Sequence, residues 1–293
     1  MSADLQHIDA PIRQRTVTSR DGTRLEVYRI GAGPRVWLMP PAMGAPLVSM
    51  KHLLEHFARS LTIVTWDMRG FYRSGAPADA EAFGVEHHLA DLDAVVEAEA
   101  LDRFVLGGWS MGVQISLEHQ HRHPERVTAL VLIHGPYEHV LASTRLGSPR
   151  LLLPLLDVLT ARAGFVTRAN RRLFSLPPLA RVLHRTGLLA RNPDHFAEVL
   201  ADFSTIDWGR YLRVVAGLHA HSAAPHLSQI RVPTLITAGT HDLLTPVAVA
   251  ERMHRAIPGS ELFVLEGGTH YSVVEFPEAL CERIDRFLAA LER

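Results

Sequence analysis

Residues 105–115 read VLGGWSMGVQI, and this stretch decides the fold. A short apolar run from Phe104 to Leu106 leads into a Gly-x-Ser-x-Gly pentapeptide centred on Ser110, and a helical pattern follows. Glycines on both sides of the serine let a strand and a helix pass closely, because a Cβ at either position would clash. We therefore expect a tight strand-to-helix turn that presents the Ser110 hydroxyl. The alternative is an ordinary serine in a tight turn.

Composition narrows the class of protein. The chain has 293 residues, 47% of them hydrophobic, with 30 basic and 31 acidic side chains and a formal charge of −1. This composition can bury a large core and gives no sign of a nucleic-acid partner. The single cysteine, Cys281, cannot form an internal disulfide, and we expect it to pack in a helix. The longest apolar stretch, Leu151 to Leu159, is too short for stable membrane insertion. The first residues lack the pattern of a signal peptide, so we expect a cytoplasmic protein.

Strands and helices alternate along most of the chain. A hairpin at Asp21-Gly22 joins two antiparallel edge strands, and the later strands are apolar runs separated by segments of helical spacing. This order predicts an α/β fold with a mostly parallel, doubly wound sheet. The expected strands are 16–19, 24–30, 36–39, 61–66, 104–106, 127–133, 234–238 and 261–265, and the expected helices are 48–58, 85–101, 111–122, 247–257 and 276–291.

The alternation stops between Tyr137 and Leu227. This segment contains eleven arginines and six carboxylates, and we expect its prolines to separate short helices: Pro149, Pro154, Pro177, Pro178, Pro193 and Pro225. We predict a helical cap at 137–227 inserted in a core formed by 1–136 and 228–293. We expect the arginines to form solvated faces; the alternative is attraction of an anionic substrate, an acyl carrier or a membrane surface.

Two residues could serve Ser110 as acid and base. Asp242 follows the predicted strand 234–238, and His270 follows the strand 261–265. A serine nucleophile needs a base and an acid that orients it, and the order Ser, Asp, His fits this architecture. The alternatives are a capping aspartate and a loop histidine. An oxyanion also needs N–H donors: we expect Met111 and Ala42 to supply them, because Pro40 and Pro41 have no N–H.

The remaining candidates carry weaker signals. Four residues neighbour the predicted site and either wall an apolar acyl pocket or belong to the core: Met43, Trp109, Tyr137 and Tyr271. Asp67 and Arg69 brace loops or bind substrate. Histidines at 119, 121 and 123 suggest a metal site, but this spacing does not put all three on one helix face and no carboxylate or cysteine cluster in the sequence supports them. We therefore expect no metal and no cofactor.

Four blocks, in order, resemble the α/β-hydrolase superfamily across nearly the whole chain. They are the strand and loop 36–44, the Asp-Met-Arg-Gly of 67–70 with Ser74, the pentapeptide 108–112, and the acid and histidine blocks around Asp242 and His270. The resemblance implies a Ser110, Asp242, His270 triad. Two departures are Pro40-Pro41, where the family usually has His-Gly, and Val113, where a glycine is common.

The expected activity is that of a serine hydrolase. It would cleave a carboxylic ester, thioester or lactone through an acyl-enzyme on Ser110, and its partner is a small acyl substrate, free or bound to a carrier. Two alternatives stay open: an acyltransferase, pathway thioesterase or cyclase on the same triad, and a non-enzymatic small-molecule receptor. A serine at the turn, where epoxide hydrolases and dehalogenases of this superfamily carry aspartate, argues against those reactions. The sequence leaves the oligomeric state open.

Overall fold

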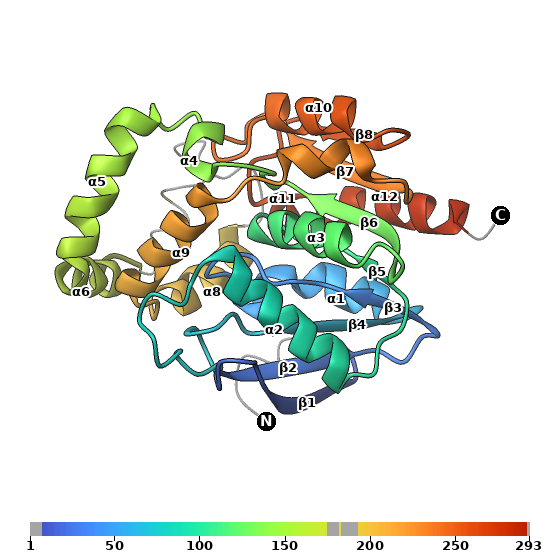
Figure 1. Ribbon diagram of the computed structural model, residues 1–293, viewed down its shortest axis with the longest axis horizontal. Helices are drawn as coiled ribbons and strands as arrows, with labels where there is room; N and C mark the ends of the chain where they lie inside the picture. The colour runs from blue at the N-terminus through green and yellow to red at the C-terminus, as the bar shows by residue number, and fades with distance from the viewer. Residues whose placement is uncertain (1–7, 175–181, 183–192, 292–293) are drawn as a thin grey trace.

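A single eight-stranded sheet forms the centre of the molecule (Figure 1). The computed structural model describes residues 8–174, 182 and 193–291. The strand order is β1-β2-β4-β3-β5-β6-β7-β8; β1 and β2 form an antiparallel edge, β2 pairs antiparallel with β4, and all other pairs are parallel. The strands are β1 (Ile12–Thr18), β2 (Arg24–Ile30), β3 (Arg35–Leu38), β4 (Leu61–Trp66), β5 (Phe104–Leu106), β6 (Val127–Ile133), β7 (Thr234–Gly239) and β8 (Glu261–Leu265). The predicted fold class is confirmed.

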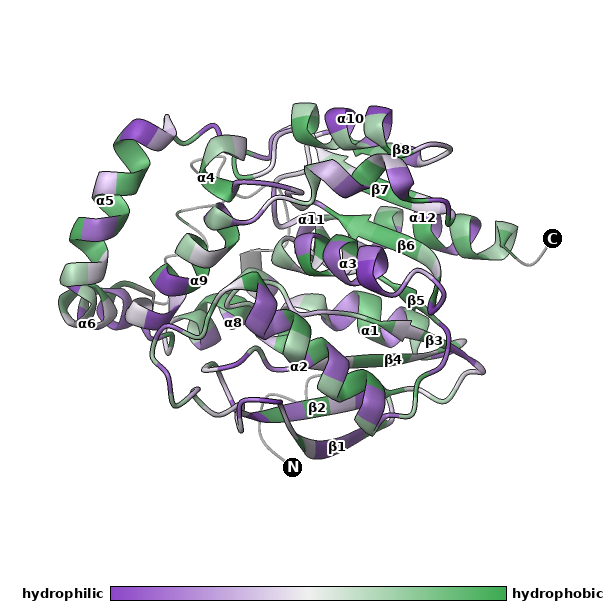
Figure 2. Ribbon diagram, viewed as in Figure 1, coloured by the Kyte–Doolittle hydropathy of each residue, from purple (hydrophilic) through white to green (hydrophobic). Residues whose placement is uncertain are grey.

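Helices cover both faces of this sheet. One face carries α2 (Val85–Ala98), α3 (Met111–Arg122) and α10 (Val247–Ala256); the other carries η2 (Leu47–Met50), α1 (Lys51–Phe57), α11 (Ser272–Glu275) and α12 (Pro277–Ala290). Every residue of β4 and of β7 is buried, as expected of central strands covered on both sides. Hydrophobic residues predominate in the central strands β4 and β6 (Figure 2).

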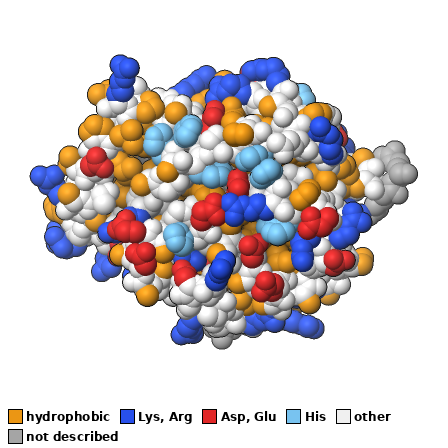
Figure 3. Space-filling view, viewed as in Figure 1, with side chains coloured by type: hydrophobic (Ala, Val, Ile, Leu, Met, Phe, Trp, Pro, Cys, Tyr) orange, Lys and Arg blue, Asp and Glu red, His pale blue; other side chains and the backbone are white. Residues whose placement is uncertain are grey.

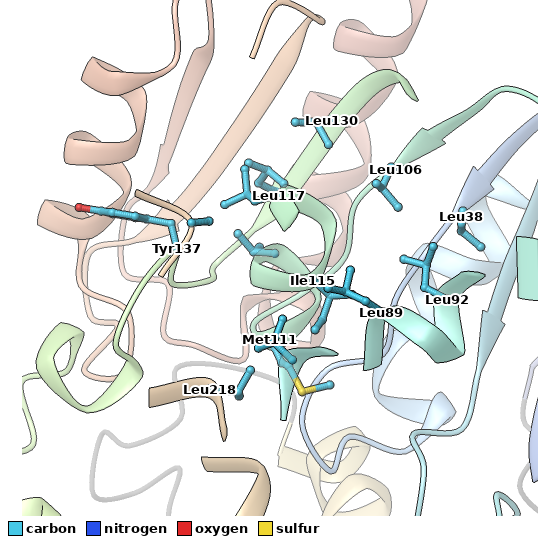
Figure 4. Close-up of a cluster of buried hydrophobic side chains, with 14 of the residues drawn as sticks. Leu38, Leu89, Leu92, Leu106, Met111, Ile115, Leu117, Leu130, Tyr137 and Leu218 are labelled. Atoms are coloured by element: carbon cyan, nitrogen blue, oxygen red, sulfur yellow. The ribbon is translucent and has the colours of Figure 1, made fainter. Parts of the chain in front are cut away.

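Two apolar clusters hold these layers together, one on each face of the sheet. Figure 4 shows the first, in which Leu38, Leu106 and Leu130 of the strands meet leucines and Ile115 of α2 and α3. The second cluster includes Cys281 of α12, which is buried and free as a packing residue would be. The sheet is therefore fixed from both sides, and the loops at its carboxyl ends have a rigid base.

Between β6 and β7 the chain forms helices that lie together at one end of the molecule (Figure 1). They are α4 (Val140–Ser143), α5 (Pro149–Ala161), α6 (Ala163–Phe174), α8 (Pro193–Phe203) and α9 (Trp208–Ala220). The short helix that follows them, η3 (Ala224–Gln229), packs instead against α3 and α10 of the core. In the described part of this segment the only strand-like pairing is an isolated bridge between Glu138 and Ser222. The division into core and cap at residues 137 and 227 stays a prediction.

The expectation that Pro154 separates two helices is wrong, because Pro154 lies inside α5. Its missing N–H would have bonded the carbonyl of Arg150, and both residues are exposed, so water can take that position. Pro149 and Pro193 begin helices as predicted, whereas Pro177 and Pro178 lie outside the described residues. Within the described part of the chain, no helix combines the length and apolarity needed to cross a bilayer.

Arg69 and Asp67 secure the loop that follows β4. The Arg69 side chain is fully buried and donates two hydrogen bonds to Asp91 of α2, with Nε–Oδ2 and Nη2–Oδ1 distances of 2.7 and 2.5 Å. It also donates to Asp21 of the hairpin at 2.8 Å. Asp67 instead accepts the hydroxyl of Tyr28 at 2.8 Å. Arg69 and Asp67 therefore each brace this loop through their own partners. This agrees with the interpretation from the sequence that they brace loops, given there beside the alternative that they bind substrate.

Replacing Asp91 by alanine should destabilise the fold. The substitution leaves the buried Arg69 guanidinium without its bidentate partner, and breaking a buried ion pair from one side costs about 3–5 kcal/mol. Urea unfolding followed by circular dichroism measures the change. Glu97→Ala, at an exposed position of the same helix, is the matched control and should shift the free energy of unfolding by less than about 0.5 kcal/mol. Equal stability of the two variants would contradict this role of Arg69.

Candidate active site

Ser110 lies in a strained turn between β5 and α3. Its backbone angles are φ 56° and ψ −116°, a region that costs a non-glycine residue about 1–3 kcal/mol. Neighbouring β6 holds this turn in place: the Ser110 amide donates to the carbonyl of Ile133 at 2.9 Å, and the Ile133 amide donates to that of Gly108 at 3.0 Å. The strain therefore persists because the adjacent strand fixes the backbone on both sides of the serine.

The loop after β3 packs directly against this turn. A Cβ added to Gly108 would lie 2.5 Å from the carbonyl oxygen of Pro40, and one added to Gly112 would lie 2.6 Å from the same atom. Both distances are shorter than any non-bonded contact that a real Cβ makes. The two glycines of the pentapeptide are therefore required by the backbone of the Pro40-Pro41 loop. The loop and the turn form one packed unit.

His270 bridges Ser110 and Asp242. Its Nε2 lies 2.9 Å from the Ser110 Oγ, and its Nδ1 lies 2.8 Å from Oδ2 of Asp242. The side chain of Asp242 is fully buried and that of His270 is 8% exposed. Burial opposes ionisation of Asp242, but the charge and hydrogen bond of His270, with hydrogen bonds from Thr245, hold the pKa of this carboxyl below its usual value. The carboxylate is thus ionised where it contacts the imidazole.

Thr245 is a further member of this cluster that the sequence did not indicate. Its hydroxyl lies 2.7 Å from Oδ2 of Asp242, 3.2 Å from Nδ1 of His270 and 3.0 Å from the carbonyl of His134. The Thr245 amide also donates to Oδ1 of Asp242 at 2.8 Å. The only sequence signal was its position three residues after Asp242, where a threonine commonly makes such local bonds. Thr245 fixes the orientation of the carboxylate.

Trp109 ties the histidine loop to the serine turn. Its indole Nε1 donates to the backbone carbonyl of His270 at 2.9 Å, and its ring packs against those of His270 and Tyr271. The residue directly before the serine therefore holds the loop that carries the histidine. This hydrogen bond of Trp109 therefore helps to set the distance between Ser110 and His270.

Met111 and Ala42 are the two residues whose N–H groups were expected to bind an oxyanion beside Ser110. Met111 is the first residue of α3, so its N–H has no carbonyl partner within the helix. Ala42 follows the two prolines and lines the same small cavity as Ser110. An N–H at a helix terminus and one in a stiff loop can together bind a negatively charged oxygen. The position of Ala42 fits the expected second donor, and its role stays a prediction.

An apolar cavity of about 60 Å³ opens beside Ser110 and His270. Of the four residues proposed to wall a pocket, Met43, Trp109 and Tyr271 line this cavity, whereas Tyr137 does not. Tyr137 packs in the cluster between the sheet and α3, and its hydroxyl accepts from Arg252 (Figure 4). The other walls were not identified from the sequence, because no motif marks them: Ala45, Pro46, Val199, Phe203, Tyr211 and Leu244.

A larger surface hollow, of about 760 Å³, lies elsewhere on the molecule. It is lined by residues at the start of β3 and β4 and near the end of α12, among them Arg35, Leu61 and Leu288. The starts of these parallel strands are at the opposite edge of the sheet from Ser110, Asp242 and His270. Ligands of open α/β sheets bind outside the carboxyl ends of the strands, so size alone does not make this hollow the site.

Comparison with known proteins agrees with this geometry. The family model described as the α/β hydrolase fold matches residues 38–277, well over half of the chain, and the protein therefore belongs to the α/β-hydrolase family. A relative from Agrobacterium fabrum, named putative carbamate hydrolase RutD, is 28% identical over 83% of this chain and 87% of its own length. An uncharacterised protein of Mycobacterium bovis is 25% identical over 90% of this chain and 78% of its own length.

Solved structures show the same fold. The enol-lactonase from Burkholderia xenovorans LB400 superposes with a TM-score of 0.75 at 22% identity, covering 94% of this chain and all of that one. A thermophilic esterase from Thermogutta terrifontis gives a TM-score of 0.74 at 20% identity, covering 96% of this chain and all of that one. At these identities the likeness establishes the fold.

Gly112→Ala should damage the site although alanine favours helices. The new Cβ would meet the Pro40 carbonyl oxygen at 2.6 Å, so the Pro40-Pro41 loop or the turn must shift. A displacement of about 1 Å in a catalytic arrangement can lower the rate about 100-fold, and we expect a fall of that order in kcat/KM for p-nitrophenyl acetate. Gly164→Ala in α6 is the matched control, because its nearest neighbour is the end of the Arg168 side chain at 3.8 Å. If Gly112→Ala keeps full activity, the packing against Pro40 is not essential.

Proposed function

We propose that this hydrolase cleaves a carboxylic ester, thioester or lactone by way of an acyl-enzyme on Ser110. The observation that carries the proposal is the unbroken chain of contacts from the Ser110 hydroxyl through His270 to Asp242, with distances of 2.9 and 2.8 Å. Each contact has the length that proton transfer requires. The family assignment supports hydrolysis as the reaction class.

The first half of the reaction forms the acyl-enzyme. The Ser110 Oγ attacks the carbonyl carbon of the substrate while Nε2 of His270 accepts the hydroxyl proton. Asp242 holds the imidazole by its Nδ1 and stabilises the positive charge that develops on the ring. The negative charge on the carbonyl oxygen is bound by the N–H groups of Met111 and Ala42. The tetrahedral intermediate then collapses, and His270 returns the proton to the departing alcohol or thiol.

The second half releases the acyl group. A water molecule gives a proton to Nε2 of His270 as its oxygen attacks the acyl carbon. The bond to the Ser110 Oγ breaks, the serine recovers its proton, and a carboxylic acid leaves. The site therefore consumes one water for each ester cleaved and ends in its starting state.

Relatives named putative carbamate hydrolase favour one second candidate. A carbamate presents a carbonyl carbon to Ser110 as an ester does, so the same contacts serve either substrate. The nitrogen next to that carbonyl needs a polar partner, and the described wall of the cavity is mainly apolar. Parallel assays of p-nitrophenyl acetate and a matched p-nitrophenyl N-alkylcarbamate distinguish an ester hydrolase from a carbamate hydrolase. Turnover of the ester, together with stoichiometric carbamylation of Ser110 by the carbamate, supports the ester hydrolase. Multiple turnover of the carbamate supports the second candidate.

Ser110→Ala should abolish hydrolysis while the protein stays folded. Loss of the nucleophile removes the acyl-enzyme route, and we expect kcat/KM for p-nitrophenyl acetate to fall at least about 10³-fold. Ser116→Ala is the matched control: this buried serine of α3 donates to the carbonyl of Gly112, and its loss should leave turnover nearly unchanged. Labelling of the wild type by a fluorophosphonate, followed by intact mass, checks the site. Turnover by Ser110→Ala at the wild-type rate would disprove the proposal.

The cavity size predicts short acyl groups. Its volume of about 60 Å³ is far below the roughly 300–1,000 Å³ of pockets for drug-sized ligands, and its walls are closely packed aromatic and aliphatic side chains. We expect kcat/KM to be highest for p-nitrophenyl acetate to butyrate and to drop by roughly tenfold or more at octanoate. Phe203→Leu, which shortens one wall, should raise the octanoate-to-acetate ratio, and Phe165→Leu at an exposed position outside the cavity should not. Equal rates from acetate to octanoate would contradict this assignment.

A further inference from the structure

His119 of α3 and His123, the residue that follows this helix, meet Asp93 of α2 where the two helices pack against each other, on the sheet face that is turned toward the viewer in Figure 1. The rings of His119 and His123 lie next to each other, with centroids 4.9 Å apart. Nδ1 of His119 lies 3.3 Å from Oδ1 of Asp93. Ligand atoms of all three residues lie within 4.8 Å of one another. The objection that the histidines lack a supporting carboxylate therefore no longer holds for this pair.

His119 makes this arrangement unusual. Its side chain is only 2% exposed, and neither of its ring nitrogens has a hydrogen-bond partner among the residues that the structure describes. The Asp93 oxygen is near enough to one nitrogen but lies outside hydrogen-bond geometry, and the ring otherwise packs against those of Phe104 and His123. Buried polar groups in folded proteins are nearly always satisfied by protein, water or an ion. A buried imidazole with two unsatisfied nitrogens beside a carboxylate indicates a ligand between them.

The donor set selects the kind of ligand. Two imidazoles and one carboxylate suit Zn²⁺ and similar late transition metals, whereas Ca²⁺ and Mg²⁺ prefer a shell of oxygens. Donors around a tetrahedral zinc ion lie about 3.3 Å apart, given bonds of about 2.0–2.1 Å, which is the separation of the His119 and Asp93 atoms. The His123 side chain is 39% exposed and has room to turn toward them. We propose that Asp93, His119 and His123 bind one Zn²⁺ ion, with water as the fourth ligand.

The surrounding charges permit a cation here. Glu125 lies 3.7 Å from Nδ1 of His123, and the nearby Arg126 is engaged by Glu125 at 3.9 Å and by the carbonyl of Leu101 at 3.0 Å. Figure 3 shows histidine, acidic and basic side chains intermingled on this face of the molecule. His119 follows Met111 by eight residues, which places it about 12 Å along the helix from the serine turn. The ion therefore ties α2 to α3 and takes no part in the reaction at Ser110, so the proposal is independent of the proposed function.

Zinc titration of the untagged protein tests this site. The protein is treated with EDTA, exchanged into chelator-free buffer at pH 7.5 and titrated with ZnCl₂ by calorimetry, and thermal unfolding is followed with and without the ion. We expect one equivalent to bind and the Tm to rise. Asp93→Asn and His123→Gln, both at partly exposed positions, should each weaken Zn²⁺ binding at least about tenfold and remove most of the Tm rise. Visible absorption of the Co²⁺-loaded protein reports nitrogen and oxygen ligation directly.

His121→Gln is the matched control for this experiment. It removes a histidine from the same helix, but the ring of His121 stacks on that of His226 at 3.5 Å between centroids and does not belong to the site. Zinc binding should persist in this variant. Absence of a one-equivalent binding event in the wild type overturns the proposal. So does unchanged affinity in both Asp93→Asn and His123→Gln, and so does loss of binding in His121→Gln, which would place the ion at the His121 and His226 pair.

Discussion

The carbonyl oxygen of Pro40 occupies the space that a side chain on Gly108 or Gly112 would need. This contact joins the loop after β3 to the turn before α3, and the position of Ser110 depends on it. Ile133 of β6 holds the same turn by two backbone hydrogen bonds. The carboxyl ends of β3, β5 and β6 thus meet at Ser110. Its strained backbone persists because the contacts with these three segments prevent it from moving to an unstrained conformation.

The electrostatics of the site follow from the same convergence. Asp242 is completely buried, and a buried carboxylate is costly unless its oxygens are satisfied. Here Oδ1 accepts the amides of Leu244 and Thr245, and Oδ2 accepts the Thr245 hydroxyl and faces His270. The charge is therefore stabilised by groups that are already in place. These bonds also hold the carboxylate against the imidazole of His270.

The elements of the core could be predicted because their signals are local. The apolar runs at 61–66 and 127–133 are bounded by turn residues, and the structure has strands with the same limits. The meeting of Ser110, Asp242 and His270 could also be predicted, since each follows a strand and the carboxyl ends of parallel strands share one edge of the sheet.

What the sequence did not show depends on contacts between distant segments. Val199, Phe203 and Tyr211 line the cavity because of how α8 and α9 pack, and no local pattern marks an apolar helix residue as a pocket wall. Asp93 is 26 residues before His119, so only the pairing of α2 with α3 brings the two together. Tyr137 lies close to the strand ends in sequence, yet it turns into the core. Proximity along the chain was a poor guide in each case.

The hydrogen bond from the Trp109 indole to the backbone of His270 has a consequence for divergence among relatives. Ser110, His270 and Asp242 are fixed to one another by partners at the strand ends and in the loops that follow them: Ile133, His134, Thr245 and Trp109 itself. Several walls of the cavity, in contrast, come from α8 and α9. Substitutions in α8 and α9 can therefore change the lining of the cavity without altering the arrangement of Ser110, His270 and Asp242. A chain of this construction can change what it accepts while keeping how it reacts, and the two properties can evolve at separate rates.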